Sequence, residues 1–178
     1  DDGKFGVEIT LPKLGANKIK AKAKDLADLE SDEASLSLNL ADKGKPIVAL
    51  VEATDGTTTV SPPSPLILYK KRVKATGTVT DDFGAEGLSV ILALNAAAEL
   101  PCDYSELTGV FTVEFDLNLG DNEAVFKAKD ASGNIGEKTY TITFADNEKP
   151  VIQVTSPQPT VNARKQTLKF TATDNIDE

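Results

Sequence analysis

Apolar and polar residues alternate along several short segments of this 178-residue chain. A period of two is typical of β-strands that have one buried face and one solvated face. Helical periodicity is scarce, and clusters of Gly, Asn, Asp and Pro separate the alternating segments, as expected for turns. The pattern therefore predicts an all-β protein built from antiparallel strands. The segments that show it best are 7–11, 36–40, 76–80, 111–117, 139–144 and 168–172.

The sequence also repeats itself at an interval of about 105 residues, which indicates copies of one folding unit. Residues 14–25 read LGANKIKAKAKD and residues 119–130 read LGDNEAVFKAKD, with seven of the twelve positions identical. Farther along, ADKGKP at 41–46 matches ADNEKP at 145–150. Upstream, VEIT at residues 7–10 matches VEFD at residues 113–116 in the same order.

The end of the chain repeats the beginning of the central unit. Residues 46–81 and 150–174 both run from a Lys-Pro, through an apolar strand and a Ser-Pro, to a second strand that ends in Thr-Asp. The central copy is longer because of an acidic, Thr-rich insert around residues 53–60, which we expect to form a loop. An open loop of this kind would favour ligand binding.

These matches divide the chain into three parts. Residues 1–45 are expected to be the C-terminal part of a module, residues 46–149 a complete module, and residues 150–178 the N-terminal strands of a following module. One interpretation is that the chain is an excerpt of a longer array. The other is that residues 150–178 complement residues 1–45 of a neighbouring copy, which would give a head-to-tail assembly.

About seven short strands in a hundred-residue module fit an antiparallel β-sandwich. An eight-stranded barrel is the alternative. A tandem arrangement favours the sandwich, because the two ends of a sandwich module lie at opposite poles and can be joined in series.

Composition excludes several functional classes. The chain has no His, Met or Trp and a single cysteine, Cys102. Catalytic pairs that depend on His and zinc sites built from His or several Cys are therefore excluded. We expect the protein not to be an enzyme, and we expect Cys102 to be a buried or idle thiol because no basic neighbour in the sequence would lower its pKa.

Charge and hydropathy further restrict the partners. The net charge of −9 repels phosphate backbones, so nucleic acid is not an expected partner. No apolar run approaches the roughly 18 residues typical of a membrane span, so membrane insertion is not expected.

The segment from Lys129 to residue 157, KDASGNIGEKTYTITFADNEKPVIQVTSP, resembles the junction between tandem bacterial immunoglobulin-like modules. It is also similar to the hyalin repeat, in which an A-x-D-x-x-G-N turn precedes the last strand and a D-x-x-x-P-x-I linker opens the next module. FTATDN at 170–175 resembles an early strand end of the same families. Hyalin repeats carry a cysteine pair, so the single Cys102 favours the bacterial immunoglobulin-like family.

The resemblance implies immunoglobulin-like β-sandwich modules in tandem, located extracellularly or at the cell surface. It implies a stalk, spacer or filament element, whose partners are neighbouring immunoglobulin-like modules or copies of itself. The alternative is an adhesive module that binds a glycan or a host protein. Neither interpretation assigns catalytic or cofactor-binding residues.

Calcium is the one metal that the sequence suggests. Its six to eight oxygen ligands could come from side chains gathered at a module junction. The linker Asp146-Asn147-Glu148 is similar to the acidic linker of cadherins, where calcium stiffens tandem domains. The alternative is that Asp and Asn occupy turns because their side chains bond to the local backbone. The candidate ligands at strand ends and in the linker are Asp81, Asp82, Asp130, Asn134, Asp146 and Glu148.

Overall fold

A computed structural model describes residues 4–156, 164–165, 167–174 and 176 of the chain. Pro157 and Asn175, which end two of the motifs quoted above, lie outside the described residues, as do the first three residues.

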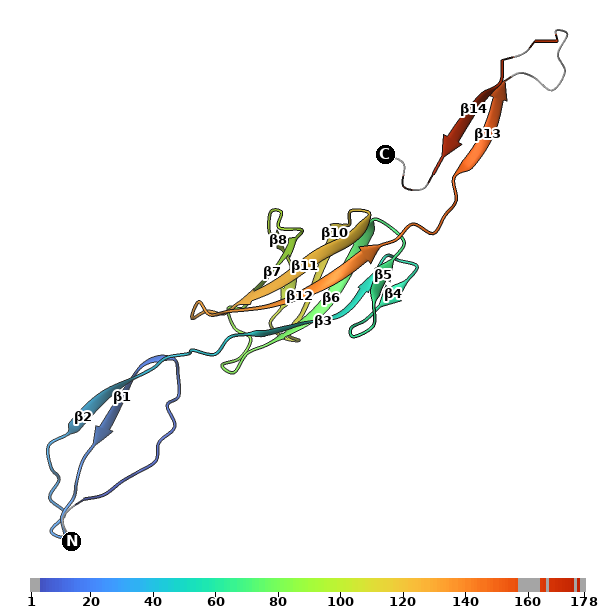
Figure 1. Ribbon diagram of the computed structural model, residues 1–178. Coiled ribbons are helices and arrows are strands. Elements are labelled where there is room, and N and C mark those ends of the chain that lie inside the picture. Colours follow the sequence, from blue (N-terminus) through green and yellow to red (C-terminus); the bar gives the residue numbers. More distant parts are fainter. Residues whose placement is uncertain (1–3, 157–163, 166, 175, 177–178) are drawn as a thin grey trace.

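The described residues form β-strands and no helix, which confirms the prediction of an all-β protein. Figure 1 shows a central body of strands with one hairpin toward each end of the chain. The strands are β1 (Gly15–Ala21), β2 (Ala34–Leu40), β3 (Ile47–Thr54), β4 (Thr59–Val60), β5 (Leu66–Leu68), β6 (Arg72–Thr80), β7 (Ser89–Leu94), β8 (Leu100–Pro101), β9 (Asp103–Ser105), β10 (Val110–Asp116), β11 (Gly120–Lys129), β12 (Ile135–Phe144), β13 (Val151–Ser156) and β14 (Lys169–Thr173).

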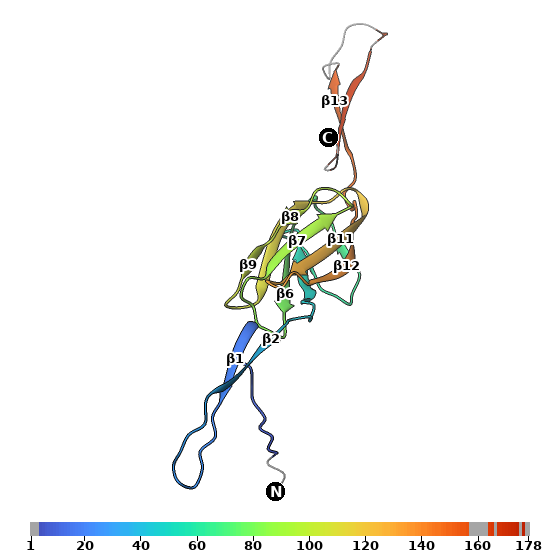
Figure 2. The same ribbon diagram turned by 90° about the vertical axis from the view of Figure 1, so that its left-hand side faces the viewer.

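The central body contains two five-stranded sheets. Their strand orders are β4-β3-β6-β10-β9 and β5-β12-β11-β7-β8. Every neighbouring pair is antiparallel except β5 and β12, which run parallel. The two sheets face each other in Figures 1 and 2, and the chain enters this sandwich at one end and leaves it at the other.

The core lies between these two sheets and follows from the alternation of each strand. In β6, Val73, Ala75 and Val79 are buried, whereas Arg72 and Lys74, which flank Val73, are exposed. From the opposing sheet, Phe126 packs with its ring centroid 5.4 Å from that of Phe111. Burial of such side chains is the main stabilising contribution, at roughly 1.5–3 kcal/mol for each large one.

Gly77 is the one buried β6 position that must lack a side chain. A Cβ at this position would overlap the ring of Phe111 and the carbonyl oxygen of Ala49. The missing side chain leaves the space that the Phe111 ring fills, so an otherwise unfavourable strand residue is required here.

Two separate hairpins flank the sandwich at opposite ends (Figures 1 and 2). In one of them β1 pairs with β2, and in the other β13 pairs with β14. Both hairpins expose large apolar side chains. Those side chains are Leu36, Leu38, Val151, Ile152, Val154 and Phe170.

One predicted strand is wrong. Residues 7–11 alternate like a strand but form none, although the similar segment at 113–116 lies within β10. The reason is a lack of partners, because β10 is hydrogen-bonded between β6 and β9, whereas residues 7–11 belong to no ladder among the described residues.

The loop predicted at 53–60 is also different from what we expected. β3 continues to Thr54, and β4 begins at Thr59 and pairs back onto β3. The insert is therefore a tight hairpin turn rather than an open loop. The Asp55 side chain closes this turn by accepting hydrogen bonds from the backbone N–H groups of Thr57 and Thr58 at 2.9 and 2.7 Å.

Within the part of the chain that the structure describes, no helix has the length and apolar character needed to cross a membrane.

Candidate metal centre

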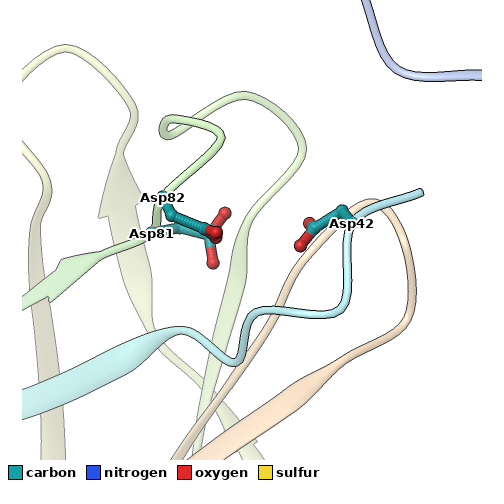
Figure 3. A group of neighbouring side chains, drawn as sticks. All are labelled: Asp42, Asp81 and Asp82. Carbon is teal, nitrogen blue, oxygen red and sulfur yellow. The ribbon is translucent and has the colours of Figure 1, made fainter. Parts of the chain in front are cut away.

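Three carboxylates meet where the N-terminal linker joins the sandwich. One carboxylate oxygen each from Asp42, Asp81 and Asp82 lies within 4.8 Å of the others. Figure 3 shows the Asp81 and Asp82 side chains, which follow the end of β6, opposite the Asp42 side chain on the linker. The sequence brings them together because Thr80 pairs with Ile47, so the residues after β6 lie beside the residues before β3.

Local hydrogen bonds hold two of these side chains in place. The N–H of Gly44 donates to Asp42 Oδ1 at 2.8 Å, and the N–H of Phe83 donates to Asp81 Oδ2 at 3.2 Å. The Gly44 backbone lies directly against the Asp82 carboxylate, where a Cβ would require that exposed side chain to move. The cluster is thus a consequence of two short turns that face each other.

Asp81 is a partly buried carboxyl group surrounded by other negative charges. Partial burial raises the pKa of Asp81, and the negative charges of Asp42, Asp82 and Asp130 raise it further. Its Oδ1 is buried and has no hydrogen-bond partner within the described structure. A buried, unpaired carboxylate oxygen is costly, and a bound divalent cation would remove that cost.

Asp130 and Asn134 lie at the same end of the sandwich but mainly satisfy each other. The backbone N–H of Asn134 donates to Asp130 Oδ1 and its Nδ2 donates to Asp130 Oδ2, both at 2.8 Å. Burial acts to raise the pKa of Asp130, but these hydrogen bonds and those from Gly133 and Ser132 outweigh it and lower the pKa. This geometry fits the turn interpretation. One weak link at 3.4 Å connects Asn134 Nδ2 to the carbonyl of Asp42.

Asp146 and Glu148 are not brought to this cluster. They follow β12, at the end of the sandwich from which the chain leaves toward β13, and both are exposed. The N–H of Glu148 donates to Asp146 Oδ1 at 3.0 Å, which is a local turn of the same kind as that made by Asp42 and Gly44. The six predicted residues are therefore divided between the two ends of the sandwich.

Asp42 is the cluster member that the sequence-based prediction missed. The signal was present, because the match between ADKGKP and ADNEKP places Asp42 at the repeat position of Asp146.

Cys102 fits the expectation of an unreactive thiol. It is partly buried beside the core and is a free cysteine. Burial raises the pKa of Cys102 to about 12, so the thiolate is scarce at neutral pH.

No protein-family model matches this chain, and a comparison with curated proteins finds no similar sequence.

Proposed function

We propose that this chain is a structural segment of a bacterial extracellular or cell-surface protein, in which tandem immunoglobulin-like modules form a stalk, spacer or filament element. The observation that carries the proposal is that both terminal hairpins reproduce strand pairs of the central sandwich residue for residue.

The first hairpin corresponds to β11 and β12. Gly15 pairs with Leu40 as Gly120 pairs with Phe144, and the two positions are separated by the same interval as the sequence repeat. The second hairpin corresponds to β3 and β6. Val151 pairs with Thr173 as Ile47 pairs with Thr80, and the register of both pairs shifts after the fourth residue. Bulges are positional features of a fold, so a shared bulge supports a shared module.

Strand order supports the immunoglobulin-like character of the module. In immunoglobulin-type sandwiches one sheet has the order A-B-E-D and the other contains G-F-C. The orders β3-β6-β10-β9 and β12-β11-β7 follow this arrangement when the short strands β4, β5 and β8 are left out and the remaining strands are lettered A to G along the chain. Entry and exit at opposite ends suit modules connected in series.

The buried, unpaired Oδ1 of Asp81 supports a calcium site at this junction, because a bound cation would give that oxygen a partner. Asp42 from the linker and Asp81 and Asp82 from the sandwich would hold the ion. Calcium would supply positive charge between three carboxylates and oxygen coordination that spans two segments. The residues themselves restrict the linker, because Asp42 and Gly44 form a turn directly against Asp82.

The experiment that tests this function measures shape and stiffness. Small-angle scattering of the full chain should give an extended particle, and its flexibility should fall when calcium is added in place of chelator. Asp81→Asn should remove the calcium effect, whereas the exposed Asp103→Asn should retain it. A compact particle would overturn the stalk function, and an identical response in chelator and calcium would overturn the role of the ion.

An open loop at 53–60 would favour the adhesive alternative, but that segment is a closed turn between β3 and β4.

A further inference from the structure

Two asparagines donate the same pair of local side-chain hydrogen bonds in two parts of the molecule. In the sandwich, Asn122 at the start of β11 donates from Nδ2 to the carbonyls of Asn118 and Gly120 at 2.7 and 3.0 Å. In the first hairpin, Asn17 donates from Nδ2 to the carbonyls of Lys13 and Gly15 at 2.8 and 2.9 Å. Both side chains are buried, with exposed fractions of 0% for Asn122 and 5% for Asn17.

The side-chain oxygens of these residues differ. Asn122 Oδ1 accepts two hydrogen bonds at 2.8 Å, one from the local backbone N–H of Asn118 and one from Nδ2 of Asn95, the residue that follows β7. Asn17 Oδ1 is buried and has no partner among the described residues. A buried acceptor without a donor is unfavourable and rare in folded proteins. The hairpin thus carries an acceptor that lacks both donors of its counterpart in the sandwich, one of which comes from the neighbouring strand.

The backbone edge beside Asn17 is free as well. In the sandwich β11 pairs with β12 on one side and β7 on the other, and Glu123 exchanges hydrogen bonds at 2.8 Å with Asn95 on the β7 side. In the first hairpin β1 pairs only with β2 within the described structure. Lys18 stands at the position of Glu123, so its N–H and C=O are the groups expected at the free edge of β1.

An apolar hollow of about 460 Å³ lies next to this edge. Three of its apolar lining residues are Ile9, Leu11 and Ile19. By the VEIT and VEFD match, Ile9 and Leu11 stand where the sandwich has Phe115 and Leu117, which are 2% and 1% exposed. The hollow is therefore lined by residues whose counterparts are buried in the core of the sandwich.

We propose that the free edge of β1, together with this hollow, accepts an added β-strand of the β7 type. The partner is an extended segment with alternating apolar residues that ends in asparagine, as Ser89–Asn95 does. It pairs antiparallel to β1 with its last apolar residue opposite Ile19, because Leu94 lies opposite Ala124 in the sandwich. The terminal asparagine donates from Nδ2 to Asn17 Oδ1, and the ladder supplies main-chain hydrogen bonds.

This site consists of the β1 edge, Asn17 and the neighbouring hollow, and it is separate from the carboxylate cluster. Strand binding there therefore does not depend on calcium or on a stalk function. The proposal goes beyond the stalk function because it states which sequence features a strand needs in order to bind the hairpin.

The test uses the full chain, labelled with nitrogen-15, and a synthetic peptide of residues 86–101. As peptide is added, the NMR chemical shifts of the Asn17 side-chain amide and the Lys18 backbone amide are expected to change and to reach saturation. Hydrogen exchange along β1 should become slower. The same peptide with alanine in place of Asn95 should bind at least about tenfold more weakly, because the buried Asn17 oxygen again lacks a donor.

A matched control separates this hydrogen bond from general apolar attachment. Against the Asn17→Ala chain, the two peptides should bind with equal affinity, since the acceptor is gone. If Asn17→Ala weakens the hairpin itself, the comparison of the two peptides on the unchanged chain still tests the hydrogen bond. No shift in β1 at saturating peptide, equal binding of both peptides to the unchanged chain, or shifts confined to the other hairpin would each overturn the proposal.

Discussion

The hydroxyl of Tyr140 accepts a hydrogen bond from the backbone N–H of Leu50 at 3.0 Å. Tyr140 lies on β12 and Leu50 lies on β3, so this contact joins the two sheets of the sandwich. It occurs where β3 shifts its register against β6. A bulge leaves backbone groups unpaired, and here a side chain from the opposite sheet satisfies one of them.

Tyr140→Phe is expected to lower the free energy of unfolding by about 1–3 kcal/mol, because it leaves the buried Leu50 N–H without a partner. Urea unfolding followed by circular dichroism measures the loss. Tyr104→Phe is the matched control, since the Tyr104 hydroxyl is buried without a hydrogen-bond partner in the described structure. Removal of that hydroxyl should leave stability unchanged or raise it. Equal losses in the two variants would contradict this assignment.

Gly136 on β12 should not tolerate a side chain. A Cβ there would overlap the carbonyl oxygen of Pro46, which is backbone and cannot rotate away. Gly136→Ala is therefore expected to cost about 1–3 kcal/mol or more through overpacking. Thermal unfolding measures the change, with Gly6→Ala as the control because a Cβ at Gly6 meets nothing within 4 Å. If Gly136→Ala is as stable as the control, the prediction is wrong, and the backbone at Pro46 can move away from β12 at little cost.

Local alternation was sufficient to predict most strands, because one face of each is buried and the other is not. Residues 36–40, 76–80 and 139–144 all lie in strands. Residues 7–11 have the same alternation and form no strand, because a strand also needs a hydrogen-bonded neighbour, which periodicity does not report. Non-local pairing likewise determined the carboxylate cluster. Asp81 and Asp82 could be chosen from their position at a strand end, but Asp42 reaches them through the pairing of Thr80 with Ile47.

Asp55 is expected to make the fold sensitive to acid. Burial acts to raise the pKa of this carboxyl, but hydrogen bonds from Thr58, Tyr69 and Thr57 outweigh it and hold the pKa far below its usual range. A group with a lowered folded-state pKa stabilises the fold above its unfolded pKa, near 4, and that stability is lost as the pH falls toward the folded value.

Asp55→Asn should therefore cost about 2–3 kcal/mol at pH 7, the range expected for hydrogen bonds to a charged group. The cost should shrink as the pH is lowered from 5 to 2, which chemical unfolding at a series of pH values would measure. A cost that is independent of pH would mean that the ionised form is not what stabilises the turn.

Asp81 is expected to show the opposite dependence on pH. Burial and the charges of Asp42, Asp82 and Asp130 raise the pKa of Asp81, so its protonated form favours folding. The stability that it contributes is present below its unfolded pKa and is lost as the pH rises through the folded value. In chelator at pH 7, Asp81→Asn should thus raise the melting temperature, whereas the exposed Asp103→Asn should not.

Added calcium should stabilise these two variants to different extents. The ion would neutralise the repulsion in the unchanged cluster but would lose a ligand in Asp81→Asn, so calcium should raise the melting temperature of Asp103→Asn more than that of Asp81→Asn. Melting curves of both proteins in chelator and in calcium measure the difference. If Asp81→Asn melts higher in chelator and calcium changes neither protein, the cluster is a site of plain charge repulsion and the calcium assignment fails. If Asp81→Asn melts lower in chelator, the hydrogen bond from Phe83 to the ionised carboxylate outweighs burial and charge repulsion, and the raised pKa of Asp81 is contradicted.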